Sequence, residues 1–319
     1  MTGKYNIEIY NNRVHYFLTV KRNFTILQGD SATGKTELIR LIGEYEANRQ
    51  SSGITLKCEV ECTVLTPVDW ELRIHSLRNK IIFIDETAPF LKSKRFAELA
   101  LGSDNYFIIV TRDALSQLPY SIEEIYGLRN ASDSEKYKSY KKIYNEMYHL
   151  YQNQTGTSED FDTVVIEDSG SGFEFYKQIY SKRCISANGK SNVYDIIRST
   201  GDIKILAIVD GASFGSEMGK LYRYIRSAHK PIAIYAPESF EYVILSSGII
   251  HVPQTILDET YMYADSMTYI SWEDFFTKYL IQKTKGSIYQ YSKAKLKDAY
   301  KTIGTINKVI AILPEAIRP

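Results

Sequence analysis

Cysteine is scarce in this chain, and long apolar runs are absent. Only 3 of the 319 residues are cysteine, namely Cys58, Cys62 and Cys184. An odd number of cysteines, without a leader segment for secretion, predicts reduced thiols and a cytoplasmic protein. Cys58 and Cys62 have no histidine or further cysteine nearby, so their spacing indicates strand packing rather than a metal site. No apolar run approaches the roughly 20 residues that span a bilayer, so we expect no membrane partner.

An excess of charge of one sign is also lacking. Lys and Arg number 39 and Asp and Glu number 38, which leaves a formal net charge of +1. A nearly neutral chain has no overall field that would draw it to nucleic acid or to an acidic membrane. Any such contact must therefore come from a local patch. The length is sufficient for two domains, each with its own core.

One glycine-containing stretch has the spacing G-x-x-x-x-G-K-[ST] of a phosphate-binding loop. A β-branched run, residues 24–27, precedes it, and the apolar residues at 38, 41, 42 and 45 recur with the period of a helix. Backbone N–H groups of such a loop face phosphate oxygens, and the helix adds its positive N-terminal end. We predict that Lys35 reaches the β- and γ-phosphates and that the Thr36 hydroxyl binds Mg²⁺. The predicted loop comprises Gly29, Asp30, Ser31, Ala32, Thr33, Gly34, Lys35 and Thr36.

A buried-strand pattern that ends in two acids provides the second part of this site. Residues 81–84 are Ile-Ile-Phe-Ile, and Asp85 and Glu86 follow them. In phosphate-loop hydrolases the first acid holds Mg²⁺ through water, and the second polarises the attacking water. We assign Asp85 to the metal and Glu86 to catalysis. A core strand that ends in a solvated acidic turn is the alternative.

The missing motifs favour ATP over GTP. The chain has no N-K-x-D, and Asp85 is followed by Glu86, so a D-x-x-G is also absent. No S-G-G-Q-like segment is present, and the separation of 50 positions from Lys35 to Asp85 leaves no room for a transporter-type helical subdomain. The sequence therefore predicts a compact ATPase domain with ATP and Mg²⁺ as cofactors.

The next apolar run, residues 106–110, ends at Thr111 and Arg112. A polar group at the tip of this strand can sense the γ-phosphate, and an arginine there would stabilise charge that develops during transfer. We therefore count Arg112 as a candidate catalytic residue. A surface pair of Arg112 and Asp113 is the alternative, and Arg95 and Arg129 are other candidates for the γ-phosphate.

The order of the predicted elements indicates an α/β fold. Strands and helices alternate up to residue 112, which predicts a mainly parallel sheet covered by helices. Two strands at 4–10 and 13–20 form a hairpin that we place beside the strand feeding the phosphate loop. We assign residues 1–130 to the ATPase domain. Residues 131–160 are predicted to be a solvated, lysine-rich helix followed by a linker.

The second half repeats the alternation of strands and helices without a second phosphate loop. Predicted strands at 163–166, 203–209 and 231–235 alternate with helices at 172–181, 190–199 and 214–228. Glu167 follows the first of these strands, and Asp210 follows the second. Carboxylates at the C-terminal ends of neighbouring parallel strands meet in one crevice and suit Mg²⁺.

These segments resemble the TOPRIM fold of topoisomerases, primases and OLD-type nucleases, especially the TOPRIM-like modules joined to ATPases in bacterial and phage defence proteins. Glu167 matches the glutamate that ends the first strand in that family, and Asp210 matches the first acid of its D-x-D. Residues 189–193 resemble its G-K-x-N, and residues 238–241 resemble its acidic segment. The resemblance covers about residues 161–247 and implies a metal site at Glu167 and Asp210.

One position departs from the family pattern. Ala212 stands where the second aspartate is expected. A two-metal phosphodiester mechanism needs acids on both ions, so the departure weakens the nuclease interpretation. Asp168, Glu238 and Glu241 are possible substitutes. We assign residues 161–255 to the TOPRIM-like domain.

Residues 256–319 are predicted to be a helical, lysine-rich C-terminal region. Eight lysines and a single acid lie between residues 278 and 308. Tyr289, Tyr291 and Tyr300 are interleaved with them. Lysines attract phosphates and tyrosines stack on bases, so nucleic acid is one possible partner of this region. A solvated lysine-rich surface is the other interpretation.

Three functions remain open at this point. The first is an ATP-controlled, metal-dependent nuclease, and phage defence and mobile-element biology are the processes that we consider for it. The second is an ATP-dependent switch with a catalytically inactive TOPRIM-like half that recognises nucleic acid or a protein partner. The third is a nucleotide-binding scaffold without turnover, and Glu86 argues against it. No unambiguous arginine finger is present in cis, so we also expect a homo-oligomer.

Overall fold

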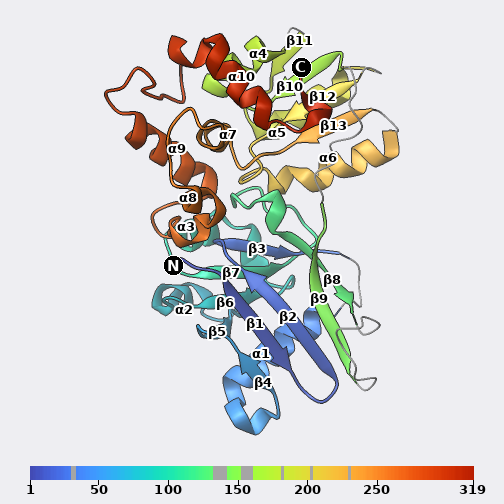
Figure 1. The fold of residues 1–319 in the computed structure, drawn as a ribbon. Coiled ribbons are helices and arrows are strands. Elements are labelled where there is room, and N and C mark those ends of the chain that lie inside the picture. Colours follow the sequence, from blue (N-terminus) through green and yellow to red (C-terminus); the bar gives the residue numbers. More distant parts are fainter. Residues whose placement is uncertain (30–33, 132–141, 152–160, 181–182, 202–203, 229–230) are drawn as a thin grey trace. The chain divides into compact units, whose positions relative to one another are not determined.

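The computed structural model describes residues 1–29, 34–131, 142–151, 161–180, 183–201, 204–228 and 231–319. The chain divides into two compact units (Figure 1). The first contains Met1–Tyr151 and Tyr261–Ser271, and the second contains Gln152–Thr260 and Trp272–Pro319. Each unit has a sheet with helices packed against it, so the fold class is α/β, as predicted.

A mixed sheet forms the centre of the first unit. Among the described residues its strand order is β4-β1-β2-β9-β8-β3-β7-β6-β5. The pairs β8–β3, β3–β7, β7–β6, β6–β5 and β2–β9 are parallel, whereas β1 pairs antiparallel with β2 and β4, and β8 pairs antiparallel with β9. The strands are β1 Tyr5–Tyr10, β2 Val14–Val20, β3 Phe24–Leu27, β4 Thr55–Lys57, β5 Cys62–Val64, β6 Ile81–Ile84, β7 Tyr106–Val110, β8 Ile125–Asn130 and β9 Ile143–His149.

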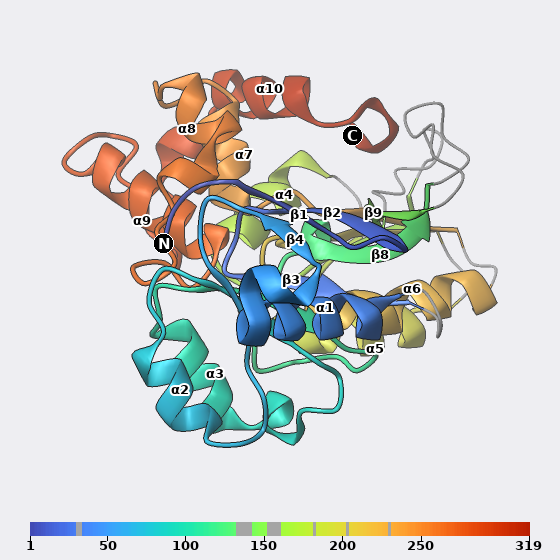
Figure 2. The ribbon, with the colours of Figure 1, turned by 90° about the horizontal axis from the view of Figure 1, so that it is seen from below.

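Helices cover both faces of this sheet. Helix α1, Lys35–Asn48, packs along β1, β4, β5 and β6 and buries Leu38, Leu41 and Ile42 (Figure 2). On the other face, Phe96 of α3 (Lys94–Leu101) packs against Phe107 of β7, and the rings of Trp70 in α2 (Trp70–Ser76) and Phe90 in η2 (Pro89–Lys92) pack against Phe96. A short helix, η3 (Ile122–Glu124), precedes β8, and η1 (Arg49–Ser52) follows α1. Strands β3, β6 and β7 are fully buried because they lie between these layers.

Two predictions about this sheet were wrong. The β1–β2 hairpin does not lie beside β3, because β9 and β8 are inserted between them. Residues 143–149, predicted as part of a solvated helix, form strand β9. This strand pairs with β2 on one side and β8 on the other, so both edges of its backbone are hydrogen-bonded and the pairing overrides the local lysine–tyrosine pattern. Residues 132–141 and 152–160 lie outside the described residues.

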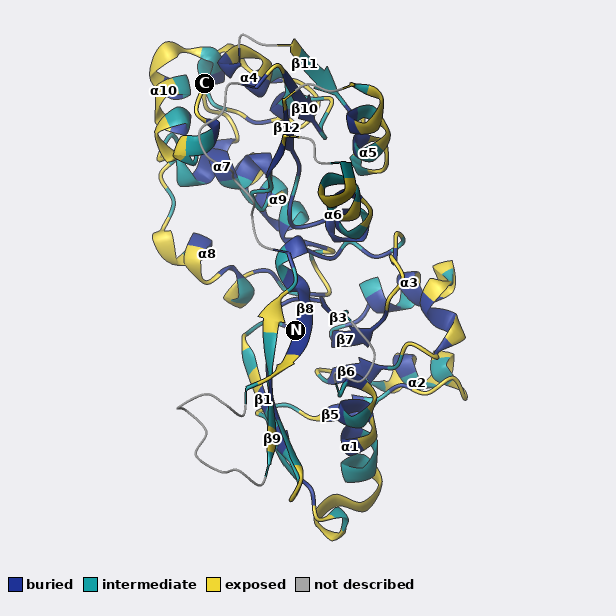
Figure 3. Cartoon of the chain, turned by 90° about the vertical axis from the view of Figure 1, so that its right-hand side faces the viewer, coloured by how far each residue is buried: buried dark blue, intermediate teal, exposed yellow. Residues whose placement is uncertain are grey.

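The second unit contains a parallel sheet in the order β11-β10-β12-β13. Helices α5 and α6 contact each other and form one helical layer. Aromatic rings of α4 and α7 contact each other, and these two helices form a second layer. Strands β10 and β12 are completely buried (Figure 3). The elements are β10 Thr163–Ile166, α4 Ser171–Ile179, β11 Arg183–Ser186, α5 Lys190–Ser199, β12 Ile205–Ile208, α6 Gly215–Ala228, β13 Ile232–Tyr235 and α7 Phe240–Ser246.

The C-terminal residues are integrated into the units. Helices α9 and α10 pack against α7. Tyr291 and Tyr300 are only 4% and 0% exposed, so these two tyrosines do not stack on external bases as the sequence suggested. The elements here are α8 Gln254–Asp258, η4 Thr260–Met262, α9 Trp272–Thr284, η5 Asp298–Lys301, α10 Ile303–Ile312 and η6 Glu315–Ile317.

Candidate nucleotide site and buried acid cluster

The two glycines of the phosphate-loop motif have backbone conformations that glycine adopts easily. Gly29 has a φ of 114° and Gly34 a φ of 87°, both in the left-handed region that favours glycine. Strand β3 ends two residues before Gly29, and α1 begins immediately after Gly34. The predicted loop residues Asp30, Ser31, Ala32 and Thr33 lie outside the described residues.

Lys35 lies across the opening of this turn. Its Nζ donates to the Gly29 carbonyl oxygen at 3.1 Å, and the residue is 7% exposed. Thr36, on the next position of α1, is exposed. Tyr16 of β2 holds the other end of the turn, because its buried hydroxyl donates to the Gly34 carbonyl oxygen at 2.9 Å. The sequence analysis missed Tyr16, since nothing in its local pattern marks a tyrosine that contacts a distant loop.

The two predicted acids follow β6 at the same edge of the sheet. Strand β7 lies between β3 and β6, and all three are parallel, so their C-terminal ends lie at one edge. Asp85 Oδ2 accepts from the Thr87 hydroxyl at 2.9 Å. Asp85 Oδ1 is buried and has no hydrogen-bond partner within the described parts of the chain. Such an orphaned carboxylate oxygen needs a water, an ion or a further donor.

Arg112 lies just beyond β7 and contacts the second acid. Its Nε is 3.3 Å from Glu86 Oε2. Asp113 pairs with Lys92 at 2.7 Å. Arg95 pairs with Glu71 at 3.1 Å, and Arg129 lies over the Tyr148 ring at the far end of β8. Of the three candidate arginines, Arg112 is the one that contacts a predicted catalytic residue.

The second unit brings Glu167 and Asp210 together. Each follows one of two adjacent parallel strands, β10 and β12, on either side of the point where the strand order reverses. This is where open α/β sheets bind ligands. Glu167 Oε2 accepts from the Asp210 backbone N–H at 3.0 Å, and Asp210 Oδ1 accepts from the Phe240 N–H at 3.1 Å. Backbone donors therefore already occupy one oxygen of each carboxylate.

Glu241, Glu273 and Lys293 complete an acid cluster, which we define as Glu167, Asp210, Glu241 and Glu273 with Lys293. Glu241 is buried, the other three acids are half-buried, and Lys293 is exposed. Glu241 is 1% exposed; its Oε1 accepts from the Tyr291 hydroxyl at 2.8 Å, whereas Oε2 has no partner within the described residues. Glu273 pairs with Lys293. Glu273 and Lys293 were missed because they lie more than 60 residues beyond Asp210 in the sequence.

Burial raises the pKa values of two of these acids, Glu167 and Asp210. Burial is the largest cause that raises the pKa of Glu167 to about 7, and the nearby Glu273 carboxylate also raises it. Burial, followed by repulsion from Glu273, Glu167 and Glu241, raises the pKa of Asp210 well above its ordinary value. Burial lowers the pKa of Lys293, but the Glu273, Glu241 and Asp210 carboxylates outweigh it and raise that pKa overall. Glu167 and Asp210 therefore keep their protons to higher pH than ordinary carboxyl groups do.

The proposed substitutes for the missing aspartate behave differently from one another. Ala212 is buried and has no carboxylate. Asp168 accepts from the N–H groups of Gly170 and Gly172 at 3.0 and 2.8 Å and so begins α4. Glu241 belongs to the cluster. Within the described residues, no three His, Cys, Asp or Glu side chains are arranged to hold a metal ion.

Comparison of the chain with protein-family models, with curated proteins and with solved structures finds no match. Within the part of the chain that the structure describes, no helix is long and apolar enough to cross a membrane.

Proposed function

We propose that the first unit binds ATP with Mg²⁺ and hydrolyses it. The observation that carries this proposal is the combination of the G-x-x-x-x-G-K-T motif with its surroundings. The motif joins a buried parallel strand to α1, both of its glycines have positive φ, and Lys35 points across the turn. An accidental glycine turn before a lysine has no reason to combine these features.

The residues present fit a magnesium ion. Asp85 offers a buried oxygen that has no partner among the described residues, and Thr36 offers an exposed hydroxyl at the start of α1. Mg²⁺ prefers a few oxygen ligands of this kind together with water and phosphate. When bound, the ion supplies charge neutralisation on the phosphate oxygens.

The roles of the protein groups follow from their contacts. Lys35 now donates to a carbonyl oxygen, and a phosphate is a stronger acceptor for the same ammonium group. Glu86 holds Arg112 at 3.3 Å. In the proposed reaction Glu86 accepts a proton from the attacking water and Arg112 stabilises charge on the γ-phosphate.

Release of inorganic phosphate from ATP tests this proposal. We expect Lys35→Ala and Glu86→Gln each to lower kcat at least about 100-fold. Glu86→Gln retains ATP binding, because the amide still fits the site, whereas Lys35→Ala weakens it. Arg95→Ala is the matched control, since Arg95 pairs with Glu71 rather than with a proposed catalytic group. Unchanged hydrolysis in Lys35→Ala would refute the proposal.

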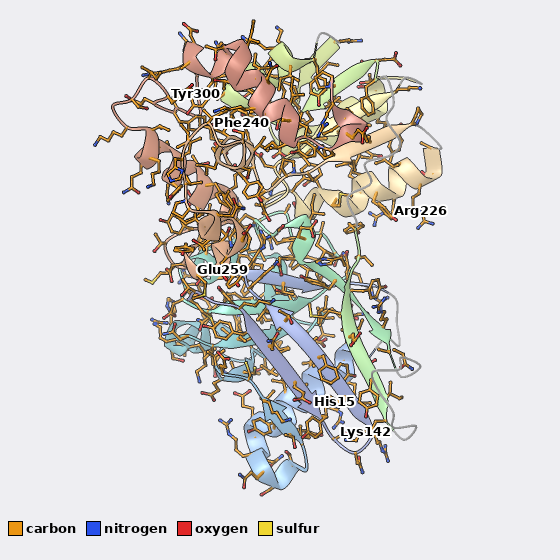
Figure 4. All side chains as sticks on the ribbon, in the orientation of Figure 1. His15, Lys142, Arg226, Phe240, Glu259 and Tyr300 are labelled. Carbon is orange, nitrogen blue, oxygen red and sulfur yellow. The ribbon has the colours of Figure 1, made fainter. Side chains whose placement is uncertain are left out.

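We propose that this ATPase controls the second unit, which acts on or recognises nucleic acid. The resemblance to TOPRIM modules supports this role. Charges on the α5–α6 layer support it too, because Arg198, Lys220, Arg223 and Arg226 outnumber Asp195 and Glu217. Arg226 projects from α6 (Figure 4). A second unit that binds a protein partner is the alternative function.

The acid cluster favours recognition over cleavage. Its residues do not fit the predicted metal centre, because backbone N–H groups occupy oxygens of Glu167 and Asp210 and Ala212 supplies none. We therefore derive no metal-dependent step at this site. Incubation of single- and double-stranded DNA and RNA with Mg²⁺ or Mn²⁺, with and without ATP, tests this choice. We expect no phosphodiester cleavage. Cleavage that disappears in Asp210→Ala would restore the nuclease function.

The source of the arginine that contacts the γ-phosphate is relevant to the oligomeric state of the protein. Arg112 supplies a candidate in cis, and a second copy of the chain could supply another. We propose a homo-oligomer in the ATP-bound state. Light scattering of the Glu86→Gln protein over a range of concentrations with ATP tests this, and a constant monomer mass would refute it.

A further inference from the structure

One surface of the first unit combines several aromatic rings with lysines. The rings of Tyr10, His15, Phe17 and Tyr144 form one layer over β1, β2 and β9. The His15 ring lies 4.5 Å from the Tyr10 ring, 4.3 Å from the Phe17 ring and 5.3 Å from the Tyr144 ring, measured between centroids. We call this layer the ring face.

Two lysines lie above the ring face. Lys57 Nζ is 5.5 Å and Lys142 Nζ is 4.8 Å from the centroid of the Tyr10 ring. His15 and Lys142 lie together at one end of these strands (Figure 4). Burial is the largest cause that lowers the pKa of His15, so at neutral pH His15 contributes an uncharged ring. The ring face thus presents flat aromatic groups beside positive charges.

A groove continues the ring face along β2. It has a volume of about 360 Å³ and is lined by Lys4, Phe17, Thr19, Lys21, Tyr126, Glu146, Met147 and His149. Phe17 belongs to both the groove and the ring face, so the two are continuous. The groove lies where β9 no longer pairs with β2, since their pairing ends at Phe17 and Glu146.

The charge of this continuous surface is positive. The surface contains four lysines and two glutamates: Lys4, Lys21, Lys57 and Lys142, and Glu8 and Glu146. Glu8 pairs with Lys57 at 2.9 Å and contacts His15 at 2.8 Å. The surplus of two positive charges exceeds the +1 of the whole chain. A polyanion is therefore attracted here even though the protein as a whole has almost no net charge.

We propose that the ring face and its groove bind single-stranded nucleic acid. Unpaired bases expose their faces and can stack on aromatic side chains, while lysines contact the backbone phosphates. A duplex keeps its bases stacked on one another, so it gains only the phosphate contacts. The inference adds a second nucleic-acid contact to the proposed function, on the ATPase unit itself, and requires neither ATP nor a metal ion.

Fluorescence anisotropy with labelled 20-mers of dT and rU, and with a blunt duplex of the same length, tests the proposal on the full chain in EDTA. We expect both single strands to bind more tightly than the duplex. Lys57→Gln/Lys142→Gln should weaken binding and flatten its dependence on salt, by about 0.7 in the logarithmic slope for each phosphate that the variant no longer neutralises. Tyr144→Leu should weaken binding at least about fivefold with an unchanged salt slope, because it removes a stacking ring.

Lys295→Gln/Lys297→Gln is the matched control. These two lysines are exposed in the C-terminal region and do not lie on the ring face. Urea unfolding of each variant separates weaker binding from lower stability. Equal effects of the two lysine pairs, or equal binding of the duplex and the single strands, would overturn the proposal. If only Arg223→Gln/Arg226→Gln on α6 weakens binding, the proposed role of the second unit stands and the ring face is excluded.

Discussion

Replacement of Glu167 by glutamine should change how the stability of the second unit depends on pH. Raising a carboxyl pKa from 4.5 to about 7 makes the ionised form about 3 kcal/mol less favourable in the folded protein. Between these two pH values the folded protein binds more protons than the unfolded chain. Its free energy of unfolding therefore falls as pH rises through this range. Glutamine has no proton to lose, and its side-chain oxygen can still accept from the Asp210 N–H.

We therefore expect the difference in unfolding free energy, Glu167→Gln minus wild type, to increase by about 2–3 kcal/mol from pH 5 to pH 8. The two tryptophans make this measurable for one unit at a time, because Trp70 lies in the first unit and Trp272 in the second. Trp70→Phe leaves Trp272 as the fluorescent reporter during urea unfolding in EDTA. Glu315→Gln replaces an exposed carboxyl group of the same unit and serves as the control. Parallel pH profiles for wild type and Glu167→Gln would refute the reasoning.

Two further predictions concern single contacts. Tyr16→Phe removes the buried hydrogen bond to Gly34 and should lower the unfolding free energy of the first unit by about 1 kcal/mol, followed through Trp70 fluorescence; no change would mean that the bond adds nothing. Gly211→Ala places a Cβ 2.7 Å from the Ala236 carbonyl oxygen and should destabilise the second unit by about 2 kcal/mol. Gly304→Ala, on α10 with open space around it, should instead stabilise it by about 0.5–1 kcal/mol, and the same sign for both alanines would contradict this account of packing.

Much of the fold could be predicted because the informative patterns are local. The apolar runs that became β3, β6, β7, β10 and β12 are buried on both faces, and such strands have continuous apolar sequences. The helices predicted from the sequence match α1, α4, α5 and α6 within a few residues. The α/β class follows from the alternation of these elements.

The remaining features depend on distant pairings that local patterns do not encode. Strand β9 was mistaken for helix because its partners β2 and β8 determine its conformation. Residues 54–66 contain two strands, β4 and β5, which lie at opposite edges of the sheet although they are close in sequence. Interleaved tyrosines in the C-terminal region suggested a nucleic-acid surface, yet the hydroxyl of Tyr291 is directed to Glu241. Composition alone does not distinguish a stacking ring from a core ring.

The division of the chain into two units limits where it can be cut to produce fragments or chimeras. Residues 261–271 belong to the first unit, although the chain on both sides of them belongs to the second. Asn23 donates from Nδ2 to the carbonyl oxygens of Ser266 and Tyr269, both at 3.1 Å. A fragment that ends at residue 151 would lack these acceptors and leave the buried Asn23 amide unsatisfied. The two units are thus interleaved in sequence, and exchange of halves between related chains would require two joined segments to be transplanted rather than one.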